Sequence, residues 1–431
     1  MIKIIDSEKI NMKDILNREI QSYTEYENIV RDIIYKVRTN GDESLKEFAL
    51  NFDKVKLEDF VVTEEEFKAA EKKVDASLVE VIKKSAANIR EFHTAQARKG
   101  FELNKDGIVL GQKISPIENV GIYVPGGTAS YPSTVLMNAI PAKIAGVPNI
   151  YMCTPPQKDG SVKAEILVAA KIAGVDKVFK VGGAGAVAAF AYGTNTIPKV
   201  DKIVGPGNIF VALAKKEVFG TVGIDMVAGP TEILVVADDS ANPVYVAADI
   251  LSQAEHDKLA TPVLVTNSEK LAKAVQEQID IQLKELPRYE IANTSIENNG
   301  KIILAKDLDK VIDIANAIAP EHLELCIANP MEMLTKIKNA GSVFLGNYTP
   351  ESLGDYFAGP NHTLPTSGSA RFSSALGVDD FVKKTQYIYY TREELGKVAK
   401  DIAEFANSEG LQGHAKAALI RFKGEEWWVN I

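Results

Sequence analysis

The chain has 431 residues, more than one ordinary hydrophobic core of roughly 100 to 200 residues can serve, so we expect at least two domains. Hydrophobic residues make up 46% of the sequence and charged residues 25%, which excludes disorder on a large scale. The net charge is -9 and the basic residues are interleaved with acids, as in 66–73, so no nucleic-acid partner is expected.

The sequence contains no apolar run that reaches the roughly 18 residues of a membrane-spanning helix. Its first residues lack the apolar stretch of a secretory signal, so we expect a cytoplasmic protein with no membrane partner. The two cysteines, Cys153 and Cys326, cannot form a disulfide framework and stand among apolar residues, which predicts buried structural thiols.

The first part of the chain, from Thr24 to Gln96, is predicted to be helical scaffold that could pack on either of the domains that follow. Thr63 is a favourable N-cap, and Glu66 three residues later completes a capping box, so one helix should begin there. His93, inside a helical stretch, is interpreted as a structural or surface histidine.

From Asn119 the pattern changes to short β-rich runs, each followed by a turn and a helical stretch. Such alternation is typical of parallel α/β units. It predicts α/β domains centred on 121–230 and 232–370, and beyond Arg371 a helical region from about Arg392 to Asn407. The expected strands cover 121–124, 177–181, 202–204, 233–236, 262–265, 301–304, 323–327 and 342–345. The expected helix N-caps between the later strands are Asn242, Ser268 and Asp307.

Two glycine-rich turns follow predicted strands. The sequence 183–188 fits the G-x-G-x-x-G/A dinucleotide pattern, and Asp201 lies near the expected distance for a ribose contact. The same glycines would also suit a tight turn and close packing of a helix on the sheet. Asn208, which follows Gly205-Pro206-Gly207, offers a donor and an acceptor at the carboxyl end of a strand, where α/β proteins bind ligands.

Histidine is scarce, with five in the chain, and two of them stand beside acids in 252–256 and 319–324. Gln253 and His256 share one helix face, so a metal could lie between them, although a helix-end histidine bonded to carbonyl groups is the alternative. The Glu321-His322 pair follows a proline and is expected in an exposed turn before a strand, where it could act as a general base or be only a surface turn.

Two later polar segments are candidates for function. The segment 348–369 is expected to be a long glycine-rich loop that contains Asp355 and His362, and long ordered loops are often functional. The segment 409–414 is interpreted as a helix end capped by Gly410, which leaves His414 unexplained.

Six motifs, taken in chain order, resemble the histidinol dehydrogenase family across nearly the whole sequence. The resemblance implies an NAD-dependent zinc enzyme that oxidises L-histidinol through L-histidinal to L-histidine, the last steps of histidine biosynthesis. The motifs are Tyr123-Val124-Pro125-Gly126-Gly127, Gly205-Pro206-Gly207-Asn208, Ala228-Gly229-Pro230, Ser252-Gln253-Ala254-Glu255-His256, Ala319-Pro320-Glu321-His322-Leu323-Glu324 and Gly354-Asp355-Tyr356.

For the fold, the resemblance implies an intertwined homodimer of α/β chains, each with two Rossmann-like parallel-sheet domains and helical N-terminal and C-terminal extensions. The C-terminal segment of one subunit would complete the site of the other. The expected parts are an N-terminal extension 1–24, a first α/β domain 25–120 plus 232–370, a second α/β domain 121–231, and a C-terminal helical segment 371–431 that reaches the partner subunit.

The resemblance also implies roles for individual residues, matched motif by motif. Where Gly185 stands the family usually has a glutamine that contacts the cofactor, and Thr231 replaces the usual serine but keeps its hydroxyl. The implied zinc ligands are Gln253, His256, Asp355 and His414, which also contact the substrate. The implied catalytic pair is Glu321 and His322. Further substrate contacts are His322, Thr231, His362 and Glu409, and the implied NAD contacts are Tyr123, Gly185 and Asn208.

Three alternatives remain open at this point. The same ligands could serve a zinc hydrolase in which Glu321 activates water, and this enzyme would need no nicotinamide. The chain could also be an α/β binding protein without turnover, an idea that Gly185 favours. A thiol mechanism for the aldehyde step would need Cys153 or Cys326, but neither has a neighbouring residue that would lower its pKa.

Overall fold

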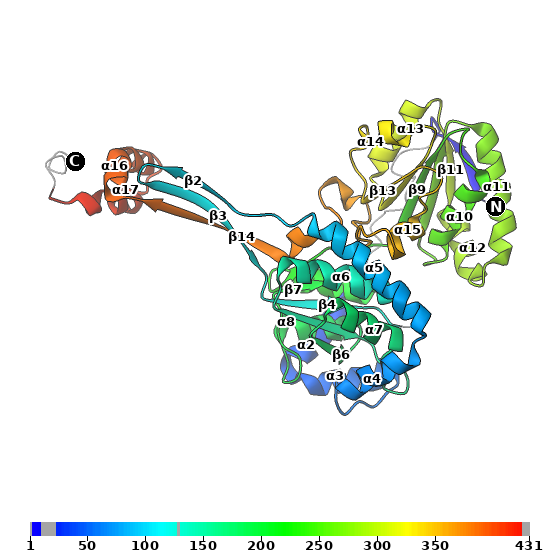
Figure 1. The fold of residues 1–431 in the computed structure, drawn as a ribbon, viewed down its shortest axis with the longest axis horizontal. Helices are drawn as coiled ribbons and strands as arrows, with labels where there is room; N and C mark the ends of the chain where they lie inside the picture. The colour runs from blue at the N-terminus through cyan, green and yellow to red at the C-terminus, as the bar shows by residue number, and fades with distance from the viewer. Residues whose placement is uncertain (1, 10–22, 127–129, 425–431) are drawn as a thin grey trace. The chain divides into compact units, whose positions relative to one another are not determined.

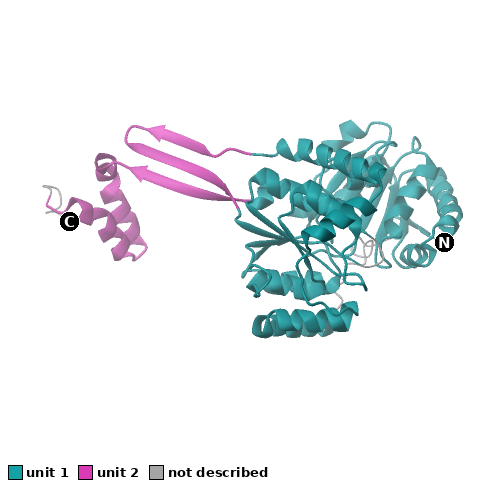
Figure 2. Ribbon diagram, turned by 60° about the horizontal axis from the view of Figure 1, so that its bottom comes forward, with its two compact units in different colours: residues 1–97, 117–381 teal, residues 98–116, 382–431 magenta. Residues whose placement is uncertain are grey.

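The computed structural model describes residues 2–9, 23–126 and 130–424, so Gly127 and much of the expected N-terminal extension lie outside it. The chain divides into two compact units, one formed by 1–97 with 117–381 and the other by 98–116 with 382–431 (Figure 1, Figure 2). In the part of the chain that is described, no helix is both long enough and apolar enough to span a membrane.

The first unit contains a six-stranded sheet in which every neighbouring pair of strands is parallel, in the order β1-β11-β10-β9-β12-β13. Alternate residues of β9 join two different apolar clusters, because helices cover both faces of the sheet. The strands are β1 (Lys3–Asp6), β9 (Glu232–Ala237), β10 (Thr261–Thr266), β11 (Lys301–Leu304), β12 (His322–Cys326) and β13 (Ser342–Leu345). The elements beside them include α10 (Pro243–Ala254), α11 (Glu269–Gln282), η2 (Leu283–Glu285), α12 (Tyr289–Asn298), α13 (Leu308–Ile318), α14 (Pro330–Leu334) and α15 (Glu351–Tyr356).

The same unit contains a five-stranded parallel sheet in the order β6-β5-β4-β7-β8. The helices before residue 97 pack on both of its faces, whereas the expected domains grouped 25–120 with 232–370. The strands are β4 (Asn119–Tyr123), β5 (Asn149–Thr154), β6 (Lys177–Lys180), β7 (Lys202–Val204) and β8 (Gly223–Ile224). One face carries α4 (Glu64–Lys73), α5 (Ala76–Thr94), α6 (Pro132–Ala145) and α7 (Ala164–Ala173); the other carries α2 (Thr24–Asn40), α3 (Asp42–Phe48), η1 (Ala49–Asp53), α8 (Gly183–Tyr192) and α9 (Ile209–Val218).

The second unit consists of an antiparallel sheet, ordered β14-β3-β2, and a helical pair. Helix α16 confirms the predicted helix almost residue for residue, but the sheet was not predicted. All nine residues of β14 are exposed or only partly buried, so the strand lacks the apolar alternation that reveals a half-buried strand. The elements are β2 (Phe101–Lys105), β3 (Ile108–Pro116), β14 (Val382–Tyr390), α16 (Arg392–Ser408), α17 (Gln412–Leu419) and η5 (Ile420–Phe422).

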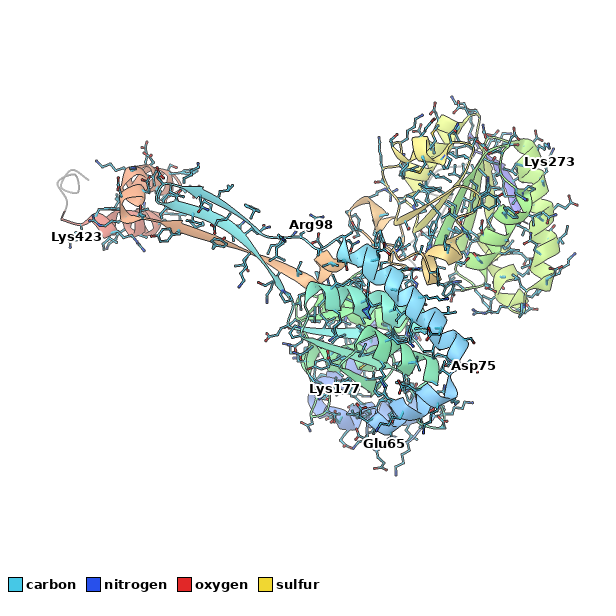
Figure 3. All side chains as sticks on the ribbon, in the orientation of Figure 1. Glu65, Asp75, Arg98, Lys177, Lys273 and Lys423 are labelled. Carbon is cyan, nitrogen blue, oxygen red and sulfur yellow. The ribbon has the colours of Figure 1, made fainter. Side chains whose placement is uncertain are left out.

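The predicted caps and strands of the first unit are confirmed. Thr63 accepts from the backbone N–H of Glu66, whose side chain accepts from the backbone of Thr63, so the capping box is complete. The three later N-caps each accept a hydrogen bond from the first turn of the helix that they begin. Figure 3 shows Glu65 and Asp75 on the outside of the unit, as the charged pattern of this region indicates.

A buried ion pair holds the turn after β7. The side chains of Lys215 and Asp225 are 2% and 1% exposed. Lys215 donates to the carbonyl oxygen of Gly205 at 2.9 Å, and Asp225 accepts from the N–H of Gly205 at 2.8 Å. Gly205 has a φ of +109°, and a Cβ there would lie 2.1 Å from the carbonyl oxygen of Tyr123, so no other residue fits. The pair therefore fixes the backbone at the start of 205–208.

We expect Lys215→Met to lower the free energy of unfolding by about 3–5 kcal/mol, because Asp225 is left as an uncompensated buried charge. Urea denaturation followed by circular dichroism measures this change. Lys273→Met, which removes an exposed helix pair with Glu269, is the matched control and should cost less than about 1 kcal/mol. Equal effects for the two variants would show that the buried pair does not hold the turn.

Candidate active site and metal centre

The predicted catalytic pair lies at the amino end of β12, beside the amino end of its parallel neighbour β9. His322 is the first residue of β12 and Glu321 precedes it, while Glu232 is the first residue of the adjacent strand β9. Glu321 and His322 are 7% and 4% exposed. The expectation of an exposed turn is therefore wrong, because side chains of Gln253 from α10 and Glu351 from α15 contact the pair.

Glu321 is held by two hydrogen-bond donors. Its Oε2 accepts from Oγ1 of Thr231 at 2.7 Å and from the backbone N–H of Glu232 at 2.9 Å. Burial raises the pKa of the Glu321 carboxyl to about 8, although both hydrogen bonds act in the opposite direction. A carboxyl group whose pKa lies near neutrality can gain or lose a proton at the pH at which an enzyme works, as a general base must.

The tautomer of His322 follows from one backbone group. Its Nδ1 lies 3.0 Å from the carbonyl oxygen of Glu232, which can only accept, so Nδ1 carries the proton. When the ring carries this one proton, Nε2 is the basic nitrogen. It faces the carboxylates of Glu351 and Asp355, at 3.6 and 3.9 Å. The structure thus presents the basic nitrogen of His322 toward a group of acids and keeps the other nitrogen occupied.

The side chain of Gln253 can be read in two orientations. One of its amide atoms lies 2.6 and 3.1 Å from the two carboxylate oxygens of Glu351, and the other contacts Thr231 and Nδ1 of His322. If the atom beside Glu351 is nitrogen, it donates to the carboxylate. If it is oxygen, it faces only carboxylate oxygens, which is unfavourable unless Glu351 is protonated or a cation lies between them. Because Nδ1 of His322 carries a proton, the amide atom beside it is the oxygen, which places the amide nitrogen beside Glu351.

A candidate metal centre lies beside the pair. One ligand atom from each of His256, Glu351 and Asp355 falls within 4.8 Å of the others. Glu351 and Asp355 are four residues apart on α15 and so share a helix face. Burial raises the pKa of Glu351 to about 7. A histidine nitrogen with carboxylate oxygens is a donor set that zinc accepts, so the residues fit such an ion.

Glu351 was not predicted as a site residue, and the structure of its segment was predicted wrongly. The segment 348–369 was expected to be a loop, but its first part forms α15, which is what directs Glu351 and Asp355 to one place. The spacing of two acids by four residues, directly after Pro350, was the available signal. His362, from the same segment, donates from Nδ1 to the carbonyl oxygen of Asp355 at 3.1 Å, and burial lowers its pKa.

The last two predicted site residues belong to the second unit. Glu409 is the C-cap of α16 and His414 lies in α17, and both are exposed in the single chain. Gly410, at a φ of +74°, follows the helix as the sequence predicts. The structure of the first unit thus brings together Thr231, Gln253, His256, Glu321, His322, Glu351, Asp355 and His362.

A pocket of about 860 Å³ lies at the carboxyl edge of the five-stranded sheet. Gly183 and Gly185, at the start of α8, line it. So do Tyr123, the last residue of β4, and Asn208, the N-cap of α9. All three residues predicted to contact the cofactor are therefore in one pocket. Asp53 also lines it, and burial raises the pKa of this carboxyl to about 6.

Some polar groups of this pocket already form hydrogen bonds within the protein. The hydroxyl oxygen of Tyr123 accepts from the N–H of Gly183 at 3.1 Å, and burial raises the pKa of Tyr123 to about 12, so its proton stays available for donation. The side-chain oxygen of Asn208 caps α9. A Cβ at Gly185 would lie 3.3 Å from Phe48, a flexible side chain, so a larger residue could be accommodated there.

The ribose contact suggested for Asp201 is wrong. Asp201 directly precedes β7 and accepts from the backbone and side-chain nitrogens of Asn119, at 3.0 and 3.2 Å. It therefore stands at the amino edge of the sheet, whereas the Gly183 turn follows β6 and stands at the carboxyl edge. Sequence distance suggested a pairing that the parallel strands do not permit.

The two thiols are structural, as predicted. Cys153 and Cys326 are free and buried, and burial raises the pKa of both well above the ordinary value for a thiol. A thiolate nucleophile is therefore disfavoured at both positions. His93 is fully buried as well, with Nδ1 bonded to Gln96 at 2.9 Å, which confirms its structural role.

Parallel α/β sheets, a buried acid–histidine pair beside a group of possible metal ligands, and a large pocket at a sheet edge are together typical of an α/β enzyme. A family model described as histidinol dehydrogenase matches residues 16–422. Histidinol dehydrogenase of Clostridium acetobutylicum is 53% identical over 420 residues, 97% of each chain, and that of Bacillus cereus is 55% identical over 398 residues, 92% of each.

The crystal structure of histidinol dehydrogenase from Elizabethkingia anophelis aligns with a TM-score of 0.94, at 39% identity and over 98% of each chain. The chain belongs to the histidinol dehydrogenase family. This confirms the resemblance and makes the chain an oxidoreductase, which excludes the binding protein without turnover and disfavours the hydrolase.

The raised pKa of Glu321 predicts how stability depends on pH. The native state favours the protonated carboxyl, so its burial destabilises the fold progressively as pH rises from about 4.5 to about 8. Glu321→Gln, which is neutral throughout, should be more stable than the parent protein at pH 8.5, and the difference should shrink toward pH 4.5. Urea denaturation at both values in the presence of a chelator measures this. A difference that does not change with pH would contradict the assignment.

Proposed function

We propose that the chain catalyses the zinc- and NAD-dependent four-electron oxidation of L-histidinol, through L-histidinal, to L-histidine. The observation that carries the proposal is the buried Glu321–His322 pair, in which the basic Nε2 of His322 faces the candidate metal centre. Membership in the histidinol dehydrogenase family supports the substrate and the reaction.

The zinc would be held by Gln253, His256 and Asp355, with His414 of the partner subunit as the fourth ligand in a homodimer. The side-chain amide of Gln253 lies beside Glu351, 2.6 Å from one of its carboxylate oxygens, and Glu351 belongs to the candidate metal centre, which supports this assignment. When bound, zinc would coordinate the imidazole and amino nitrogens of the substrate and so fix the position of its carbinol carbon. Thr231, His362 and Glu409 would provide further substrate contacts.

The two members of the pair would act in sequence. His322 would accept the hydroxyl proton at Nε2 while the hydride leaves the carbinol carbon, which gives the aldehyde. Glu321, as carboxylate, would then remove a proton from water as the water attacks the aldehyde carbon. A second hydride transfer from the hydrate gives the carboxylic acid. The burial of both residues keeps bulk water from the intermediate.

The pocket lined by Tyr123, Gly185 and Asn208 would hold the dinucleotide, which accepts the hydride when it is bound. The N-terminus of α8, which begins at Gly183, lies at this pocket and would favour the charge of a pyrophosphate.

Cofactor stoichiometry tests the reaction. With saturating NAD and zinc, limiting histidinol should yield two equivalents of NADH, and a chelator should abolish the signal until zinc is restored. One equivalent would mean that the oxidation stops at the aldehyde. The absence of NADH, together with zinc-dependent release of an amine from amide substrates, would favour the hydrolase instead.

We expect His322→Asn to leave the zinc content unchanged but to lower kcat by about 10²- to 10⁴-fold, because the amide retains a donor to Glu232 but offers no base. Elemental analysis and steady-state kinetics measure the two effects. His93→Asn, which changes a histidine of the scaffold, is the control for folding. An unchanged kcat for His322→Asn would remove this residue from its proposed role.

Gly185→Gln tests the pocket. A displacement of Phe48 by a few tenths of an ångström would admit the Cβ, and the new amide would add a donor and an acceptor beside the cofactor. We expect a lower KM for NAD with little change in kcat. Gly185→Ala, which adds the Cβ but no polar group, is the matched control. A KM lowered equally by both variants would show that helix stability, not cofactor contact, is responsible.

A further inference from the structure

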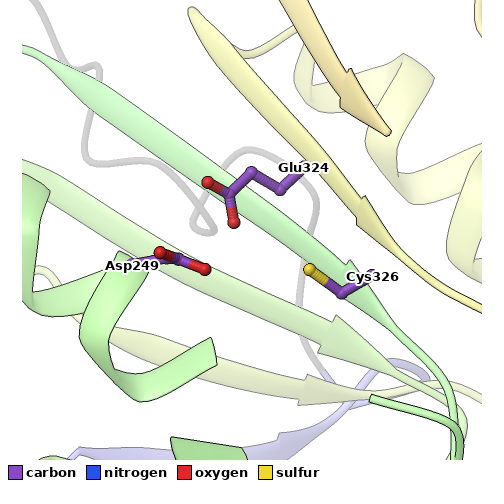
Figure 4. A group of neighbouring side chains, drawn as sticks. All are labelled: Asp249, Glu324 and Cys326. Carbon is purple, nitrogen blue, oxygen red and sulfur yellow. The ribbon is translucent and has the colours of Figure 1, made fainter. Parts of the chain in front are cut away.

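Three side chains form a buried group beneath the site. Glu324 and Cys326 are two residues apart on β12 and therefore project from the same face of the sheet. Asp249 on α10 points toward them (Figure 4). One oxygen or sulfur atom from each residue falls within 4.8 Å of the others. The proposed mechanism uses none of these residues, yet two of them are acids in an apolar setting.

Glu324 is bonded to two other elements. Its Oε1 accepts from the backbone N–H of Glu351, the first residue of α15, at 2.8 Å. Its carboxyl also hydrogen-bonds the carboxyl of Asp249 on α10. Two carboxyl groups can form such a bond only when one is protonated. Oε2 of Glu324 is buried and accepts no hydrogen bond from an N–H group or a hydroxyl group of the described residues. Glu324 is 1% exposed and so holds the proton more firmly than the half-buried Asp249.

The three elements joined in this way carry the site. Helix α10 provides Gln253, α15 provides Asp355, and β12 begins with His322. We propose that Glu324 is a positioning residue whose carboxyl group joins α10, through Asp249, to the first turn of α15 and so sets the spacing of the metal ligands relative to His322. The part of this inference that concerns zinc rests on the proposed function; the part that concerns the position of α15 does not.

The variants separate hydrogen bonding from packing. In Glu324→Gln, the amide can donate to Asp249 and accept from the N–H of Glu351, so both bonds survive without a shared proton. In Glu324→Leu, a side chain of similar size makes neither bond. Asp249→Asn and Asp249→Leu repeat the comparison from α10, in case Glu324→Leu does not fold. Cys326→Ala is the control for a change in the same buried group.

Two measurements on the full-length protein test the inference. Zinc affinity is measured by competition with a chelator, and amide hydrogen exchange is followed at 351–356 in the zinc-free protein. We expect the leucine variants to bind zinc roughly 10- to 100-fold more weakly and to exchange faster in α15. The amide variants and Cys326→Ala should resemble the parent protein in both measurements.

Three results would overturn the inference. Parent-like exchange and zinc affinity in the leucine variants would show that α15 needs no such support. Amide variants as impaired as the leucine variants would show that the two hydrogen bonds are not the cause. A second zinc per chain that Cys326→Ala removes would show that a cation, not a proton, joins the acids. If the parent protein binds no zinc, the proposed function fails while the exchange measurement still decides the positioning role.

Discussion

The backbone of Glu232 is the group on which the site depends. Its N–H donates to Glu321 and its carbonyl accepts from Nδ1 of His322, so a single residue of β9 orients both members of the pair. This arrangement requires β9 and β12 to be parallel neighbours in the observed register, with His322 opposite Ile233. A slip of one residue would turn the side chains of one strand to the other face of the sheet and separate the pair from both contacts.

The two sheets offer opposite edges for two different tasks. The acid–histidine pair occupies the amino edge of the six-stranded sheet, near the C-terminal ends of α10 and α13, where helix dipoles favour positive charge. The pocket occupies the carboxyl edge of the five-stranded sheet, where α8 begins and the dipole favours negative charge. A metal ion suits the first edge and a pyrophosphate suits the second. The helix directions therefore agree with the proposed positions of the metal centre and the cofactor pocket.

Local sequence predicted the parts of the fold that local interactions determine. The capping residues Thr63, Asn242 and Asp307 satisfy donors within their own helices, so each could be recognised from its neighbours. Most strands of the two parallel sheets were predictable from their short apolar runs, although β1, β5 and β8 were not predicted. The exposed strand β14 has no such pattern, and its partner β3 lies more than 260 residues earlier in the chain.

The site was predictable in its residue types but not in its environment. Glu321 and His322 could be named from their motif, whereas their burial depends on α10 and α15, which arrive from distant parts of the sequence. Glu351 was not predicted as a site residue, because its place beside His322 depends on the formation of helix α15. Asp201 was misassigned because sequence distance does not reveal at which edge of a sheet a residue lies.

Burial has opposite consequences for the acids of this site, depending on what each one faces. It raises the pKa of Glu321, Glu324 and Glu351 alike, because none of the three has water to stabilise its charge. The proposed cation lies beside Glu351 and near Glu321, so its charge would favour their ionised forms and make Glu321 an effective base near neutral pH. Glu324 lies beneath them and faces Asp249 instead, so it would stay protonated. The same apolar surroundings could thus supply two different groups. Glu321 would be a base that ionises when the cation binds, and Glu324 would be an acid that stays neutral and holds the helices in place.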